Sequence, residues 1–265
     1  MWDESVARRG SCEISSCLWK LFASIPPEVE RVTVISDSCG GQNKNIQMAT
    51  MMMYAVELYS MKQIDHIFLE SGHTQMEVDS MHACIEKASR CVDVIVPKDW
   101  GIVAALAKKT GQPYNVSRIT SQDVIDWKKV SLSFFTNRKI TETGVLLNWT
   151  KVKWLQFNKG SPVMKAKYEC DTSDFMQLRV HKGTRGRSRK HEGLQETMKP
   201  LYTSSVPIST AKYRDLQDLC RTGVISTEYH EFYKSLKLSG AVQDRLDEPD
   251  AQEESDNENL AFSSW

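Results

Sequence analysis

Residues 31–69, RVTVISDSCGGQNKNIQMATMMMYAVELYSMKQIDHIFL, contain the pattern that decides the fold. The β-branched run at residues 31–36 predicts a buried strand, and it ends at a turn, residues 37–41, that contains two glycines. Residues 45–61 are apolar on most sides, which predicts a well-buried helix, and residues 64–69 predict a second strand. A strand, a helix and a strand of these lengths indicate a right-handed βαβ unit with two parallel strands.

The alternation of helices and strands continues on both sides of this unit. Residues 10–22 place apolar side chains on one stripe, which predicts a helix before the first strand. Further along, residues 75–89 predict a helix with an inward apolar face, residues 92–96 a third strand and residues 101–109 a short helix. This order predicts an α/β domain with a largely parallel sheet over residues 1–110.

The pattern changes after residue 110. Strands are predicted at residues 114–119, 145–157, 163–168 and 175–180, and helices at residues 121–130, 209–220 and 227–236. Residues 111–242 are therefore expected to form a smaller α+β region. Residues 243–265 are acidic and nearly free of apolar side chains between 244 and 258, which predicts a disordered tail.

Composition excludes little about function. Lys and Arg number 34 and Asp and Glu number 34, so the total charge says nothing about a polyanionic partner. No apolar run approaches the roughly 20 residues of a membrane helix, and the polar N-terminus does not resemble a secretory signal. Seven irregularly spaced cysteines favour reduced thiols. We therefore expect a nuclear or cytoplasmic protein without a membrane partner.

Acidic side chains follow the first two predicted strands. Asp37 comes directly after the first strand, and Glu77, Asp79 and Glu86 follow the second. Chemistry in open α/β sheets gathers at the carboxyl ends of strands, and Asp79 and Glu86 are seven residues apart on one helix face. Converging carboxylates suit Mg²⁺ or Mn²⁺, and a pair of such ions assists in-line phosphoryl transfer.

Two other interpretations of these residues remain open. An Asp after a strand is often a turn residue or a helix cap, and acids on a helix usually face solvent. The segment from Asp37 to Asn45 could instead hold a phosphate, with Lys44 ahead of a helix N-terminus, although its spacing departs from that of a P-loop.

Two motifs carry a resemblance to a known family. ISDSCGGQNKN at residues 35–45 and FLESGHTQMEVDSMHACIEKA at residues 68–88 resemble an uncharacterised domain of transposon-derived proteins, widespread in arthropods and other animals. The segments WDE-x₄-RGSCEISSCL and LYTSSVPISTAKYRDLQDLC, at residues 2–18 and 201–220, resemble the same proteins. That family is similar to an RNase H-like transposase core, in which an Asp-Asp-Asp/Glu triad holds two divalent metals.

The resemblance implies roles for four residues. Asp37 matches the second acid of the triad, Asp79 is the candidate for the third, and Glu86 is the reserve. His73, with Thr74, matches a turn that would orient these carboxylates or a phosphate. His73 could equally pack and form a hydrogen bond at the turn.

The first acid of the triad has no counterpart in this sequence. An RNase H-like core begins with three antiparallel strands, and its first Asp lies on the first of them. The resemblance therefore implies a partial core that lacks these N-terminal strands, which would leave the strand at residues 31–36 unpaired on one side. Loss of one ligand would remove most of the metal affinity, so we expect the chain to be inactive by itself.

A basic segment and three tryptophans bear on nucleic-acid binding. The segment at residues 181–191 contains five cations that could neutralise DNA phosphates: Lys182, Arg185, Arg187, Arg189 and Lys190. It could also be a nuclear-localisation patch or a solvated loop. Trp127, Trp149 and Trp154 could stack on bases, but their alternation with Val, Leu and Phe favours core packing first.

Together these features predict a transposon-derived, RNase H-like domain related to metal-dependent DNA cleavage or strand transfer, inactive as this chain. The alternative is a non-catalytic, domesticated module that binds nucleic acid or protein.

Overall fold

The computed structural model describes residues 1–70, 76–90, 92–180 and 198–239. The chain folds into two compact units, each built from segments far apart in the sequence. Among the described residues, the sheet unit comprises residues 9–70, 123–180 and 198–201, and the helical unit comprises residues 1–8, 76–90, 92–122 and 202–239. Within the described residues, no helix is long and apolar enough to cross a membrane.

The sheet unit contains five strands in the order in which they occur in the chain: β1 Arg31–Ser36, β2 Gln63–Phe68, β3 Trp154–Asn158, β4 Val163–Lys167 and β5 Met176–Arg179. β1 and β2 are parallel, and each later pair is antiparallel. The predicted α/β fold class and the parallel pairing of the first two strands are confirmed. The prediction of a largely parallel sheet is wrong, because three of the four pairings among these described strands are antiparallel. β1 forms the edge of the sheet, as predicted, but no residue of it is buried, so the prediction of a buried strand at residues 31–36 is wrong.

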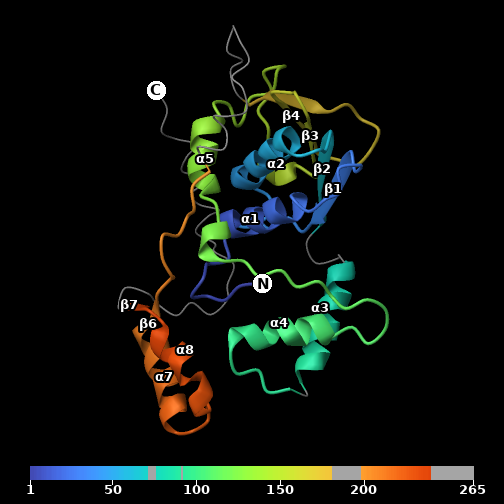
Figure 1. Ribbon diagram of the computed structural model, residues 1–265. Coiled ribbons are helices and arrows are strands. Elements are labelled where there is room, and N and C mark those ends of the chain that lie inside the picture. The colour runs from blue at the N-terminus through green and yellow to red at the C-terminus, as the bar shows by residue number, and fades with distance from the viewer. Residues whose placement is uncertain (71–75, 91, 181–197, 240–265) are drawn as a thin grey trace. The chain divides into compact units, whose positions relative to one another are not determined.

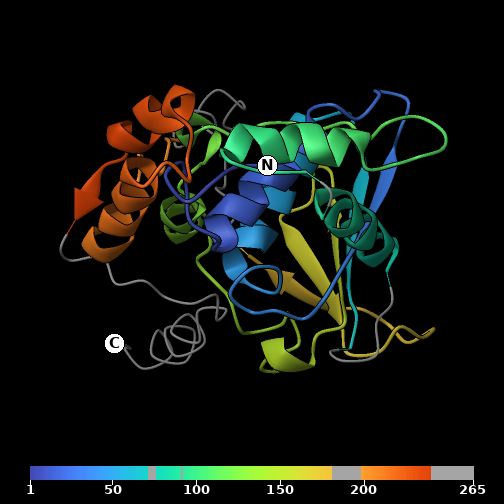
Figure 2. The same ribbon diagram turned by 90° about the horizontal axis from the view of Figure 1, so that it is seen from below.

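Three helices cover one face of this sheet: α1 Ser11–Phe22, α2 Ile46–Leu58 and α5 Trp127–Phe134. α2 packs on β2 and β3 and also contacts α1 and α5. Figures 1 and 2 show α1 and α2 together on one side of the strands, with α5 beyond them. The arrangement leaves β1–β5 with an inner face toward the helices and an outer face away from them.

The core lies between the helices and the inner face. Ten of the 13 residues of α2 are buried, which confirms the prediction of a well-buried helix. Leu155, Phe157 and Leu178 project into the same core from β3 and β5. Trp127 of α5 is fully buried, and its indole Nε1 donates a hydrogen bond of 3.2 Å to Ser16 Oγ on α1.

The helical unit has a smaller core. Its elements are α3 Glu77–Ser89, α4 Pro97–Leu106, α7 Thr210–Arg221, α8 His230–Ser235 and two short parallel strands, β6 Ile208–Ser209 and β7 Leu238–Ser239. Val96, Cys220, Ile225 and Tyr233 are buried together in this unit. The predicted helices at 75–89, 101–109, 209–220 and 227–236 thus correspond to helices of the structure, with shifted ends.

Several sequence predictions about this half of the chain are wrong. Residues 92–96 form no strand, because Ile95 and Val96 pack against the C-terminal helices instead, while Val92 is 53% exposed. Residues 114–119 also form no strand. No residue of α3 is buried, so its predicted inward face does not enter a core.

Two predictions near α5 and β3 need correction as well. A short 3₁₀ helix, Ser121–Asp123, precedes α5, which begins at Trp127 because the Asp126 carboxylate accepts a hydrogen bond of 2.9 Å from the Lys129 amide and caps it. The long strand predicted at 145–157 is confined to β3, after a second 3₁₀ helix, Trp149–Lys151. The division at residues 110 and 242 stays a prediction, and the acidic tail lies outside the described residues.

Candidate functional site at the strand ends

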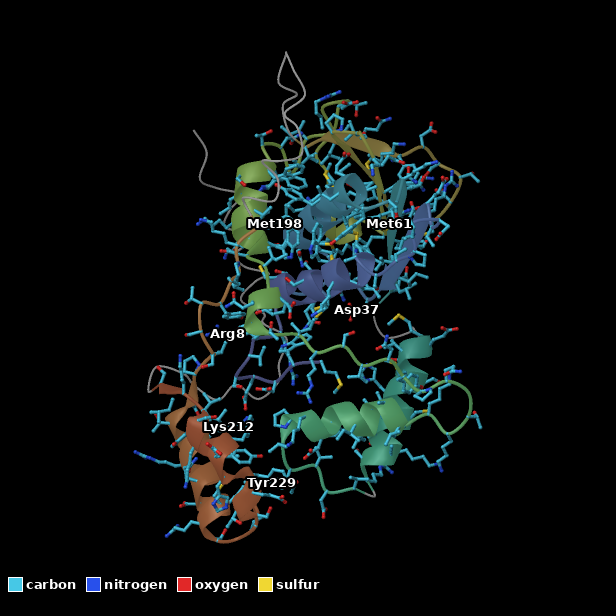
Figure 3. All side chains as sticks on the ribbon, in the orientation of Figure 1. Arg8, Asp37, Met61, Met198, Lys212 and Tyr229 are labelled. Atoms are coloured by element: carbon cyan, nitrogen blue, oxygen red, sulfur yellow. The ribbon has the colours of Figure 1, made fainter. Side chains whose placement is uncertain are left out.

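The loop between β1 and α2 holds Asp37 in an exposed position (Figure 3). Its Oδ1 accepts hydrogen bonds from the Cys39 amide, at 3.1 Å, and from Asn43 Nδ2, at 2.6 Å. The Cys39 carbonyl in turn accepts from the amides of Asn43 and Lys44, at 2.8 and 2.9 Å. Within the described residues no cation pairs with Asp37, so its negative charge is oriented by neutral donors and is not compensated.

The next turn of the loop fixes the start of α2. Asn45 is buried, and its Oδ1 accepts a hydrogen bond of 2.9 Å from the Met48 amide. Its Nδ2 donates to the Gly40 carbonyl at 2.9 Å. Asn45 therefore caps the helix and ties the cap to the Asp37 loop, which is a role that its residue type favours.

A buried histidine of β2 contacts Ser36, the last residue of β1, on the core side of the sheet. His66 of β2 is 1% exposed, and its Nε2 lies 2.9 Å from Ser36 Oγ. Ser36 Oγ donates to the Asp37 carbonyl at 2.9 Å, so the consistent assignment has Nε2–H donating to Ser36. The His66 ring also packs on Phe68, with centroids 4.1 Å apart. A chain of two hydrogen bonds thus connects the core to the peptide of Asp37.

Burial keeps His66 neutral. Desolvation lowers the pKa of His66 from 6.5 to about 3. Its Nδ1 has no hydrogen-bond partner within the described residues. In the assigned tautomer this atom is a bare acceptor, which costs less to bury than an unpaired N–H donor.

Two lysines lie at the same end of the strand pair. Lys44 Nζ donates to the Thr150 carbonyl at 2.8 Å and lies 5.3 Å from the centre of the Phe68 ring. Burial, together with the charge of Lys153, lowers the pKa of Lys44. Lys153 Nζ pairs with Glu169 at 2.9 Å and with Glu70 at 3.1 Å. The hydrogen bonds that Lys153 donates to Glu169 and Glu70 raise its pKa.

The acids expected to join Asp37 have local partners. Asp79 Oδ2 accepts a hydrogen bond of 2.8 Å from the Met76 amide, which is a capping role at the start of α3. Glu86 pairs with Arg90 at 2.8 Å on an exposed surface of α3. Both acids belong to the helical unit and Asp37 to the sheet unit, so their convergence stays a prediction.

The remaining predicted site residues lie outside the described residues. These are His73, Thr74 and the five cations Lys182, Arg185, Arg187, Arg189 and Lys190. Across the described parts of the chain, no group of three or more His, Cys, Asp or Glu side chains is arranged to hold a metal ion.

Sequence reasoning missed the supporting residues Ser36 and His66. The available signal was a polar pair, Asp65-His66, inside a strand that is otherwise apolar enough to be buried. Buried polar side chains need partners, but the sequence did not show that the partner of His66 would be Ser36 on the neighbouring strand.

Comparisons with known proteins give one match. No curated protein and no solved structure matches the chain. Residues 10–141 match the model of DUF7869, a domain of unknown function, and this segment includes β1, β2, the Asp37 loop and His66. The candidate site therefore lies within the part of the chain that is similar to DUF7869.

Proposed function

We propose that this chain is a transposon-derived, RNase H-like domain related to metal-dependent DNA cleavage and strand transfer, that it is inactive by itself, and that Asp37 binds Mg²⁺ or Mn²⁺. The observation that carries the proposal is the exposed Asp37 carboxylate at the carboxyl end of a parallel strand, held by neutral donors alone. Catalytic groups of open α/β sheets occupy this position. The family resemblance of the surrounding motif supports the same role.

The chemistry of the loop fits a hard divalent cation. Mg²⁺ and Mn²⁺ prefer carboxylate oxygen and usually keep several waters when one or two carboxylates bind them. Asp37 offers such an oxygen at Oδ2, because the hydrogen bonds from Cys39 and Asn43 both go to Oδ1. Lys44, in the same loop as Asp37, carries a positive charge that would attract a phosphodiester, which is the usual second ligand of the metal in nucleic-acid enzymes.

Calorimetric titration with Mn²⁺ tests this role. Asp37→Asn removes the charge and keeps Oδ1 as a hydrogen-bond acceptor, so the loop should stay folded. Asp171→Asn is a matched control, because Asp171 is also exposed and its Oδ1 also accepts from the amide two residues on, that of Ser173, at 3.1 Å.

We expect the parent and Asp171→Asn to bind Mn²⁺ and Asp37→Asn to lose binding. Equal binding by all three proteins would refute Asp37 as a ligand. Asp79→Asn extends the test, since loss of binding there would place Asp79 in the same site.

The second candidate function is a non-catalytic module that binds nucleic acid or protein. It is favoured by the local roles of Asp79 and Glu86, which act as a helix cap and an ion-pair partner. DNA binding by a parent protein that shows no Mn²⁺ binding in the titration would support this candidate over the first. Binding that requires both the metal and Asp37 would exclude it.

A further inference from the structure

The outer face of the sheet has an unusual composition. The strand register places Thr33, Asp65, Gln156, Lys165 and Gln177 in one row across all five strands. A sheet covered by helices on both faces has apolar side chains on both. The inner face of this sheet is apolar apart from Ser36 and His66 and packs on α2, whereas this outer row is polar throughout.

A buried carboxylate organises the centre of this face. Asp65 is 7% exposed, and its Oδ1 accepts hydrogen bonds from Trp154 Nε1 at 2.8 Å and from Gln156 Nε2 at 2.9 Å. Its Oδ2 accepts from Gln63 Nε2 at 2.6 Å. No cation of the described residues pairs with Asp65. The carboxylate therefore fixes the indole ring and two amide side chains in defined orientations.

An aromatic pair is formed by Trp154, in the adjacent row on β3, and Phe175, which directly precedes β5. The rings of Trp154 and Phe175 lie 5.1 Å apart at 77°. Lys167 Nζ lies 4.4 Å from the centre of the Phe175 ring and 5.4 Å from that of Trp154, and it donates to the Asp171 carbonyl at 2.9 Å. These contacts hold both rings in place, so little side-chain entropy would be lost when a planar ligand binds them.

The charges of the outer face are mostly positive. Arg31 and Lys165 belong to it by register, at its β1 edge and on β4. Arg179 belongs to it on β5 and pairs with Glu142 at 3.2 Å. Asp65 supplies a negative charge at the centre, and three hydrogen bonds from neutral side chains stabilise this carboxylate.

We propose that this outer face binds single-stranded nucleic acid. Bases would stack on Phe175 and Trp154, the amides of Gln156 and Gln177 would contact base edges, and Arg31 and Lys165 would contact phosphates. Single-strand-binding sheets combine these three groups, and stacking is available only when the bases are unpaired. A duplex presents its phosphates but not its base faces, so it lacks the ligand for the aromatic pair. The proposed binding needs no metal at Asp37.

Fluorescence anisotropy in EDTA tests the proposal. The probes are labelled single-stranded DNA and RNA oligonucleotides of about 15 nucleotides, which is within the site sizes of known single-strand-binding folds, and a duplex of the same sequence. Phe175→Leu removes a stacking surface and keeps apolar bulk. We expect it to weaken single-strand binding about tenfold, since stacking contributes ~1–3 kcal/mol per base.

Two double variants distinguish binding at this face from nonspecific electrostatic attraction to the whole protein. Arg31→Gln with Lys165→Gln removes two cations from the outer face, and Lys128→Gln with Lys129→Gln removes two exposed cations from α5. Two lost phosphate contacts should make the negative slope of log affinity against log salt concentration shallower by about 1.4. The α5 control should leave affinity and slope nearly unchanged.

Three results would overturn the proposal: no single-strand binding by the parent, equal affinity of parent and Phe175→Leu, or tighter binding of the duplex. Circular dichroism spectra that match the parent would show that each variant is folded. The DNA and RNA probes identify which strand is preferred. Mn²⁺ binding is measured separately, so failure here leaves the proposed metal site untouched.

Discussion

Protonation of His66 should oppose folding in acid. Burial lowers the pKa of this side chain from 6.5 to about 3 in the folded protein, whereas in the unfolded chain it keeps its ordinary value. Between these two pH values the unfolded chain binds a proton that the folded chain does not bind. Stability therefore falls as the pH falls from about 6.5 toward 3.

The size of this effect follows from the two pKa values. Linkage gives a loss of about 2 kcal/mol at pH 5 relative to pH 8, and a limit of about 5 kcal/mol near pH 3. His66→Gln removes the titration and keeps an N–H group that can donate to Ser36. Between pH 8 and pH 5, the free energy of unfolding of the parent should fall by about 2 kcal/mol more than that of the variant. This difference does not depend on how much the substitution itself destabilises the protein at pH 8.

Urea unfolding followed by circular dichroism measures this difference at each pH. The carboxylates titrate in both proteins, so their contribution cancels in the comparison. Equal pH dependence in the two proteins would refute the reasoning. Proton NMR of the parent provides a second measurement that does not depend on the variant, and a His66 ring signal that titrates near pH 6.5 would contradict it as well.

Three further predictions concern stability and are measured by urea unfolding at pH 7.5. Asn45→Ala should cost about 1–2 kcal/mol, because it removes the buried cap of α2; an unchanged free energy of unfolding would exclude that role. Leu155→Ala, in the centre of the core, should cost about 2–5 kcal/mol, whereas Leu146→Ala, at a side chain that is 67% exposed, should change stability by less than about 0.5 kcal/mol. Asp79→Ala should cost about 1 kcal/mol through the lost cap of α3, and Glu86→Gln less than about 0.5 kcal/mol because its ion pair is exposed. A larger loss of stability in Glu86→Gln than in Asp79→Ala would contradict the capping role of Asp79.

The position of Asp37 was predictable because its signals are local. The strand before it has a β-branched pattern, and the residues after it include Asn45, a helix-capping residue type. These features place an acid in the loop that follows a strand without any knowledge of distant contacts. The partners of that acid were not predictable, because Ser36 and His66 meet through the register of two strands that are separated by a helix.

The prediction of a strand at residues 92–96 was wrong because the structure of this segment depends on distant contacts. Val92 to Val96 is a short apolar run, and such a run is compatible with a buried strand or with a loop that packs on a core. The outcome depended on Cys220, Ile225 and Tyr233, more than a hundred residues away, which bury Val96 in a small helical core. A strand also needs a neighbour with free backbone groups, and the local sequence cannot show whether one is available.

The sequence by itself determined the strand, helix and strand of residues 31–69, the helix before them and the exposed acid at Asp37, because periodicity, turn residues and caps act over a few residues. Only the tertiary structure decided that β3, β4 and β5 extend the sheet antiparallel to β2 and that Asp65, Trp154 and Lys165 share its outer face. The physical reason is register. Which side chains stand beside one another in a sheet is set by hydrogen bonds between segments about 90 residues apart, and no local pattern specifies those bonds.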